Sequence, residues 1–216
     1  MPASGPHANR PVRQRGAPLA EARAAVVAVH GRGASAENIL ELADYAATPG
    51  VAWLAPSAAG GTWYPNRFMA PIASNEPYLG SALEAVGEVV RQIEAAGRPV
   101  EKTVLLGFSQ GACLAAEYAA RNPRRYGGVV ALSGGLIGPE GTTWPYPAGL
   151  DGTPVFLGCA DVDPHIPLGR VEESASVLER LGGAVTARVY PGMGHTINDD
   201  EMGWLHQLLD GLVQEA

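Results

Sequence analysis

The chain has 216 residues, of which 46 % are hydrophobic and 17 % are charged, and this suits a single domain with a sizeable core. Its formal net charge of −7 argues against a nucleic-acid-binding protein. No stretch is apolar for long enough to span a membrane, and the N-terminal residues lack the apolar core of a secretory signal, so we expect a cytoplasmic protein. Cys113 and Cys159 lie in apolar segments and are predicted to be buried free thiols.

Strand-like and helix-like segments alternate along the chain. In chain order we predict strands and helices as follows: strand 24–30, helix 37–47, strand 51–55, helix 78–96, strand 102–108, helix 110–121, strands 127–133 and 154–159, helix 168–181, strand 184–190 and helix 199–213. Short apolar strands separated by helices indicate an α/β fold with a mostly parallel sheet. Two long loops, 56–74 and 134–152, follow strand ends, where open α/β sheets build their sites.

The sequence indicates one α/β domain over residues 23–216 with a leader over residues 1–22. The leader is rich in Pro, Arg and Gly. It could be a flexible tail or it could add an edge strand to the sheet, and its composition leaves both options open.

The pentapeptide Gly107-Phe108-Ser109-Gln110-Gly111 joins a predicted strand to a predicted helix. A Gly-x-Ser-x-Gly pattern in this context is typical of a nucleophile elbow, the sharp turn that carries the serine of α/β-hydrolases. Because side chains two places either side of the serine would collide, both flanking positions need glycine. We therefore predict Ser109 as a catalytic nucleophile.

A serine hydroxyl needs a base to take its proton, and His195 is the predicted base. It follows the last predicted strand and precedes the last helix, as the order Ser, acid, His of α/β-hydrolases requires. The acid is expected after the strand 154–159. Two aspartates stand there, and either Asp163 or Asp161 could orient the imidazole.

The tetrahedral intermediate needs two hydrogen-bond donors for its oxyanion. We predict the backbone N–H of Gln110, next to the nucleophile, and the backbone N–H of Arg32, in the glycine-rich segment 30–33 after the first strand. No metal or other cofactor is predicted. The remaining histidines are not predicted to do chemistry: His30 is expected to bond its own loop, and surface positions are expected for His7, His165 and His206.

Taken together, these motifs resemble the phospholipase/carboxylesterase family of small α/β-hydrolases, which includes the acyl-protein thioesterases. The matching segments are Val29-His30-Gly31-Arg32-Gly33, Gly107-Phe108-Ser109-Gln110-Gly111-Ala112, Asp163-Pro164-His165-Ile166-Pro167 and Gly194-His195. The resemblance runs from about residue 24 to the C-terminus and implies an α/β-hydrolase fold without a large lid. In the family the acid belongs to an Asp-Pro-x-Val-Pro-like segment. This selects Asp163, although a count from Gly158 would select Asp161 because two extra residues intervene. A homodimer is compatible with the resemblance.

The loop over residues 61–68 also resembles a segment that borders the pocket in this family. Its aromatic residues Trp63, Tyr64 and Phe68 are expected either to line an acyl pocket or to pack the loop onto the domain. Arg67 is a candidate for binding an anionic group of the substrate, as is Arg32, with a solvated or structurally paired arginine as the alternative.

The combined prediction is a serine hydrolase that cleaves small carboxylic esters through an acyl-enzyme. A thioesterase or a lysophospholipase could use the same residues. A non-catalytic binding protein of the same fold is disfavoured because all three triad positions are filled. Ring opening of the dienelactone hydrolase kind is disfavoured because such enzymes typically carry cysteine at the elbow.

Overall fold

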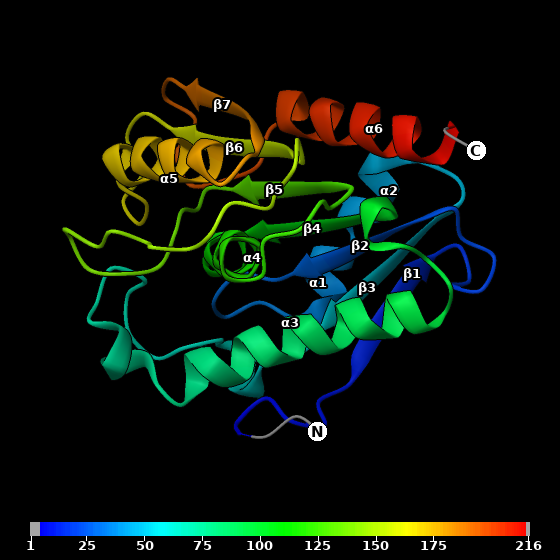
Figure 1. Cartoon of the computed structure of the whole chain (residues 1–216), viewed down its shortest axis with the longest axis horizontal. Helices are drawn as coiled ribbons and strands as arrows, with labels where there is room; N and C mark the ends of the chain where they lie inside the picture. Colours follow the sequence, from blue (N-terminus) through cyan, green and yellow to red (C-terminus); the bar gives the residue numbers. More distant parts are fainter. Residues whose placement is uncertain (1–4, 215–216) are drawn as a thin grey trace.

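The computed structural model describes residues 5–214 as a seven-stranded sheet flanked by helices (Figure 1). The strand order is β1-β3-β2-β4-β5-β6-β7, and every pair is parallel except β1 with β3. The strands are β1 (Val12–Gly16), β2 (Ala24–Val29), β3 (Val51–Pro56), β4 (Thr103–Phe108), β5 (Gly128–Leu132), β6 (Pro154–Ala160) and β7 (Ala184–Tyr190). The predicted α/β-hydrolase architecture is confirmed.

Six α-helices and three short 3-10 helices lie in the described part of the chain. The α-helices are α1 (Ala36–Leu40), α2 (Leu42–Ala46), α3 (Tyr78–Ala95), α4 (Gln110–Arg121), α5 (Leu168–Arg180) and α6 (Asp199–Gln214). The 3-10 helices are η1 (Ala59–Gly61), η2 (Ile72–Asn75) and η3 (Val100–Lys102). The predicted strands and long helices agree with these bounds to within a residue or two. The exception is the predicted helix 37–47, which is divided between α1 and α2 at Glu41.

Alternate residues of the central strands build a core on each face of the sheet. On β2, Ala25, Val27 and Val29 join a cluster that includes side chains of α3, α4 and α5. The intervening residues Ala24, Val26 and Ala28 join a second cluster with α1 and α6. Because successive side chains of a strand point to opposite faces, a fully apolar strand is what a sheet covered on both sides requires.

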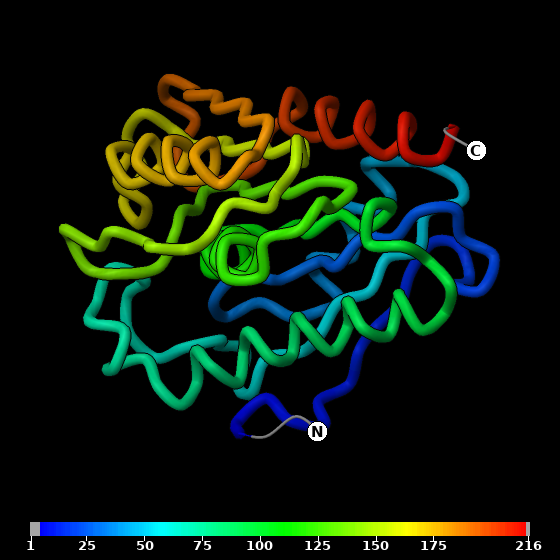
Figure 2. Tube along the Cα trace, viewed as in Figure 1, coloured from blue at the N-terminus to red at the C-terminus, as the bar shows by residue number. Residues whose placement is uncertain are grey.

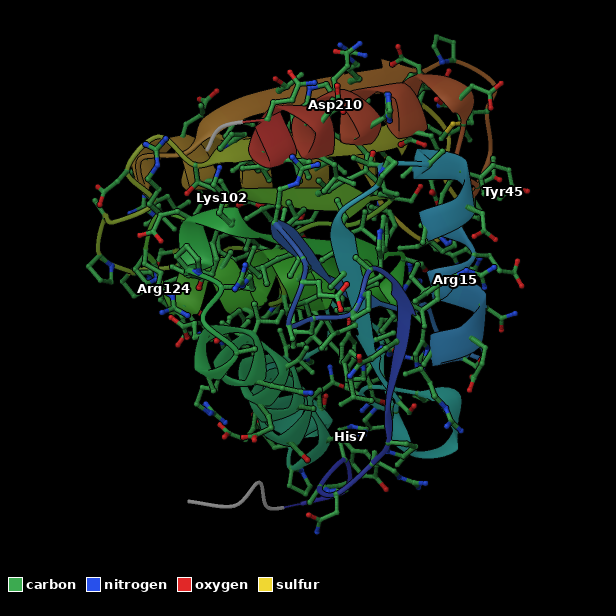
Figure 3. All side chains as sticks on the ribbon, turned by 90° about the vertical axis from the view of Figure 1, so that its right-hand side faces the viewer. His7, Arg15, Tyr45, Lys102, Arg124 and Asp210 are labelled. Carbon is green, nitrogen blue, oxygen red and sulfur yellow. The ribbon has the colours of Figure 1, made fainter. Side chains whose placement is uncertain are left out.

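The segment expected as a leader contributes the edge strand β1. Its five residues pair with β3 in the register Val12 to Pro56 through Gly16 to Ala52. Arg13 Nε lies 2.8 Å from Glu37 Oε1, and Arg15 Nε lies 2.9 Å from Asp44 Oδ1. Glu37 belongs to α1 and Asp44 to α2, and Figure 3 shows Arg15 beside these two helices. The edge-strand alternative therefore applies, and the folded domain begins before residue 23. Residues 1–4 of the leader lie outside the described residues.

The tube in Figure 2 follows the described chain from its first residues near α3 to α6, which covers the opposite face of the sheet. Within residues 5–214, none of the helices has the length and apolar character needed to cross a bilayer. The carboxyl ends of the parallel strands meet at one edge, and the loops that leave them carry the predicted site residues.

Candidate active site

The elbow between β4 and α4 holds Ser109 in a strained backbone conformation with φ 56° and ψ −120°. Non-glycine residues rarely adopt positive φ, and such strain persists only where the surroundings enforce it. The surroundings do so here, because the N–H of Ser109 donates to the Leu132 carbonyl at 2.9 Å and its carbonyl accepts from the Cys113 N–H at 3.0 Å. The elbow is thus locked between β5 and the first turn of α4.

Both glycines of the elbow stand where a side chain has no space. A Cβ at Gly107 would lie 2.2 Å from the Gly111 carbonyl oxygen, and a Cβ at Gly111 would lie 2.0 Å from the Val29 carbonyl oxygen. These neighbours are backbone atoms that cannot move aside. The glycine requirement inferred from the sequence therefore has a direct steric cause.

The structure brings Ser109, His195 and Asp163 into one hydrogen-bonded chain. Ser109 Oγ lies 2.8 Å from His195 Nε2, and His195 Nδ1 lies 2.7 Å from Asp163 Oδ2. A carboxylate can only accept, so Nδ1 carries the hydrogen and Nε2 is left to accept from the serine hydroxyl. This is the protonation pattern that a serine nucleophile requires of its base.

The Asp163 carboxylate is fully buried yet well supplied with donors. Its Oδ1 accepts the backbone N–H groups of His165 at 2.8 Å and Ile166 at 3.1 Å, while Oδ2 faces His195. Burial pushes the pKa of Asp163 up, but the hydrogen bonds from His195 and from the two N–H groups outweigh it and leave the pKa below its usual value. The carboxylate is therefore ionised at neutral pH.

The alternative acid, Asp161, has a different set of partners. Its Oδ1 accepts the backbone N–H groups of Val162 and Gly192, each at 2.9 Å. It thereby ties the loop after β6 to the loop that carries His195. The geometry favours Asp163 as the partner of the imidazole and gives Asp161 the loop-capping contact.

The two predicted oxyanion donors border the same cavity as Ser109. Neither the N–H of Arg32 nor the N–H of Gln110 has an acceptor among residues 5–214. Gln110 begins α4, so its N–H is one of the free donors at a helix start, where the helix dipole also favours negative charge.

The side chains of Arg32 and Gln110 hold the loop over residues 61–68, here named the aromatic loop. The guanidinium of Arg32 donates to the carbonyls of Tyr64 at 2.9 Å, Pro65 at 3.0 Å and Asn66 at 2.7 Å. The Gln110 amide accepts the Trp63 N–H at 2.9 Å and donates to the Tyr64 carbonyl at 2.8 Å. The loop over residues 61–68 is thus fixed from both sides of the predicted oxyanion position. Of the two roles considered for Arg32, these bonds support a structurally paired side chain.

A cavity of about 590 Å³ opens at Ser109 and His195. Tyr64, Arg67 and Phe68 of the aromatic loop line it. Trp63 is fully buried and is not among the described lining residues; it donates from Nε1 to the His30 carbonyl at 2.8 Å. The aromatic loop therefore divides between the two roles considered for it: Trp63 packs the loop onto the domain, while its neighbours face the cavity.

The cavity lining includes two titratable residues that the sequence did not predict as part of the site. His165 is exposed, as predicted, but its ring also stands edge-on to the His195 ring with centroids 4.7 Å apart. Cys113 lies one turn after Ser109 on α4, and burial raises the pKa of its thiol to about 12, so it is protonated and unreactive at neutral pH. The spacing of four residues on a predicted helix could have placed Cys113 beneath the nucleophile.

Two other histidines support the loops. His30 Nδ1 lies 2.8 Å from the Gly31 carbonyl, as expected, and its Nε2 accepts the Ala58 N–H. The surface position predicted for His7 is wrong, because this side chain is only 2 % exposed and bonds the Trp63 carbonyl and the Ala59 N–H. Burial lowers the pKa of both imidazoles and so keeps them neutral.

The sheet, the elbow and the Ser-His-Asp chain define an α/β-hydrolase of the serine type. Residues 16–212 match the phospholipase/carboxylesterase family, so the chain belongs to that family. It is 44 % identical to a phospholipase/carboxylesterase from Dyadobacter fermentans whose crystal structure superposes with a TM-score of 0.90, covering 96 % of this chain and 99 % of the other.

Two curated relatives are more distant. Acyl-protein thioesterase 1 of Saccharomyces cerevisiae is 32 % identical over 130 residues, which cover 56 % of this chain and 55 % of the relative. A probable carboxylesterase of Oryza sativa is 28 % identical over 146 residues, or 67 % of this chain and 61 % of the relative. The matched region spans about half the length of the thioesterase.

Proposed function

We propose that this protein is a serine hydrolase that cleaves carboxylic esters of small molecules. The observation that carries the proposal is the continuous chain from Ser109 Oγ through His195 to the buried Asp163 carboxylate, at the mouth of a cavity. Membership of the phospholipase/carboxylesterase family supports the same reaction class.

Acylation starts with the attack of Ser109 Oγ on the ester carbonyl carbon. His195 Nε2 takes the hydroxyl proton, and the ionised Asp163 stabilises the resulting imidazolium through the Nδ1 hydrogen bond. The developing oxyanion accepts hydrogen bonds from the free N–H groups of Arg32 and Gln110. When the intermediate collapses, the imidazolium gives its proton to the departing alcohol and leaves an acyl-serine.

Deacylation reverses these roles. His195 removes a proton from water, and the resulting hydroxide equivalent attacks the acyl-serine carbonyl. The same two N–H groups donate hydrogen bonds to the second oxyanion. Collapse returns the proton from the imidazolium to Ser109 Oγ and releases the carboxylic acid. Every step uses side chains and backbone groups of this chain.

The decisive experiment is labelling with a fluorophosphonate probe alongside turnover of p-nitrophenyl esters of increasing acyl length. We expect the wild type to label and to hydrolyse the esters, and Ser109→Ala to do neither while remaining folded. A folded wild type that neither labels nor turns over any ester would contradict the proposal and favour a non-catalytic binding protein of this fold.

A thioesterase is the second candidate, because one curated relative bears the name acyl-protein thioesterase 1. Both reactions use the same residues, so the site geometry does not separate them. A comparison of kcat/KM for an oxygen ester and a thioester with identical acyl groups decides between them. We expect the oxygen ester to be the better substrate once each value is divided by the rate of spontaneous hydrolysis.

We also keep a cytoplasmic location as part of the proposal. Its support is that Cys113 and Cys159 are both free and buried, as is usual where thiols stay reduced. A homodimer remains a prediction from the family resemblance, and size-exclusion chromatography with light scattering tests it.

A further inference from the structure

The cavity at Ser109 has a charge character opposite to that of the whole protein. The chain carries 22 acidic residues and a net charge of −7. Yet the fourteen described residues that line the cavity include two arginines and two histidines but no aspartate or glutamate. The nearby acid, Asp163, lies behind His195 and is already hydrogen-bonded on both oxygens. The cavity therefore presents positive charge to whatever enters it.

The two arginines are used differently. Arg32 directs its guanidinium at three carbonyl oxygens of the aromatic loop. Arg67 is exposed, and across residues 5–214 its guanidinium has no hydrogen bond, ion pair or ring contact. Its five N–H donors are thus available to a ligand, and their planar fork matches a carboxylate.

The backbone around Arg67 is held firmly, so this cation projects from a fixed point. The Arg67 carbonyl accepts from the Ala70 N–H at 3.0 Å and from the Asn75 side-chain amide at 3.2 Å. The preceding N–H, of Asn66, donates to the Asn75 side chain at 2.8 Å. The next residue, Phe68, is buried and accepts a hydrogen bond from the Gly138 N–H. A ligand would need to order only the Arg67 side chain, which lowers the entropic cost of binding.

We propose that the substrates are esters that also carry a carboxylate, such as half-esters of small dicarboxylic acids, and that Arg67 binds this carboxylate. The inference rests on the proposed esterase function. Ser109 attacks the ester group while the guanidinium fork holds the other end of the same molecule. A charge-assisted pair in a concave site is stronger than one at an open surface, so it contributes to substrate choice.

The test compares monomethyl glutarate with dimethyl glutarate, which differ by one methyl group and one negative charge, together with the corresponding succinate and adipate pairs. Initial rates are followed by proton release at pH 7.5 for the wild type, Arg67→Gln and Arg67→Lys. Arg10→Gln is the matched control, because Arg10 is exposed and lies outside the cavity lining.

We expect the wild type to prefer the half-ester. Arg67→Gln is expected to raise KM for the half-ester about tenfold and to change kcat/KM for the diester less than about twofold. Arg67→Lys keeps the charge but not the fork, so it retains part of the preference. The preference should shrink as NaCl rises from about 0.02 M to about 0.5 M, and Arg10→Gln should behave as the wild type.

Two outcomes overturn the inference. One is that Arg67→Gln leaves the ratio of kcat/KM for the half-ester to kcat/KM for the diester unchanged, whether both values fall together or neither falls. The other is that the wild type prefers every diester. In both cases Ser109-dependent hydrolysis of the diester would leave the esterase function intact, whereas no hydrolysis of either ester would contradict the function itself.

Discussion

The two halves of the catalytic chain are held in place by different forces. The nucleophile half, β4 and α4 around Ser109, is closed in by backbone atoms that leave no space beside Gly107 or Gly111. In the base half, Gly192 and Gly194 have φ of 71° and 76° and nothing within 4 Å of an added Cβ. That half is held by the hydrogen bonds of Asp161 and Asp163 and by the ring contacts of His195 with Phe108 and His165. Close backbone packing therefore fixes the serine, whereas the position of the histidine depends on polar and ring contacts, and the two halves should respond to different substitutions.

The largest expected effect lies in the polar half. Asp163→Asn keeps the shape of the acid but presents an amide to the imidazole, which favours the wrong tautomer. We expect kcat to fall by about 10³–10⁴-fold while the fold is kept. Asp161→Asn is the control, because Asp161 meets only backbone N–H groups. Steady-state kinetics should show less than about a tenfold loss for Asp161→Asn, and a larger loss there than in Asp163→Asn would reverse the assignment.

The next largest effect tests the packed half. Gly111→Ala puts a methyl group against the Val29 and His30 carbonyls, and we expect it to lower the free energy of unfolding by about 3 kcal/mol or more. Gly192→Ala meets only the strain of positive φ, which costs about 1 kcal/mol. Urea denaturation of both variants checks this. Equal losses would mean that packing does not distinguish the two halves.

A pH effect is expected where the base half joins α6. Glu201 and Asn198 cap the start of α6 reciprocally, with Asn198 N–H to Glu201 Oε2 at 2.9 Å and Glu201 N–H to Asn198 Oδ1 at 3.0 Å. The other oxygen, Oε1, is buried without a partner. Burial raises the pKa of Glu201 to about 7 from its ordinary value of 4.5, so the folded protein binds this proton more tightly than the unfolded chain does.

This group contributes stability that declines as pH rises from about 4.5 to about 7 and is lost above. Glu201→Gln is neutral at every pH. We therefore expect it to exceed the wild type in stability by about 2 kcal/mol at pH 8 and to lack this pH dependence. Urea titrations at pH 5 and pH 8 measure both. An unchanged pH dependence in Glu201→Gln would show that another group is responsible.

The smallest effect concerns the loop between the halves. In Arg32→Lys the side chain loses the planar fork with which the guanidinium bonds three carbonyls of the aromatic loop. We therefore expect this loop to loosen. We also expect kcat to fall about tenfold, which corresponds to about 1.4 kcal/mol in activation free energy. Arg180→Lys, which loses a single bond to the Trp144 carbonyl, is the control and should stay within about twofold. Faster amide exchange in residues 61–68 would identify the cause.

Local steric patterns could be predicted from the sequence, whereas contacts between distant loops could not. The elbow is a local steric pattern, so Ser109 and its glycines could be predicted from five residues. The residue pattern alone left Asp161 and Asp163 open, and only the family resemblance favoured Asp163, because the choice depends on which carboxylate reaches an imidazole 32 residues away. The contact of His165 with His195 and the three carbonyl partners of Arg32 could not be predicted either, because they arise where loops that are distant in sequence meet. The apolar periodicity predicted the long helices, but it did not predict the break at Glu41 or the strand β1.

The strand β1 has a practical consequence for handling this protein. It covers the edge of β3, a strand that is buried throughout and contains Trp53. A version shortened to residues 23–216 would keep every proposed catalytic residue and still leave that apolar edge unpaired. Unpaired edges join other edges, so the shortened enzyme should be active when dilute and should precipitate when concentrated.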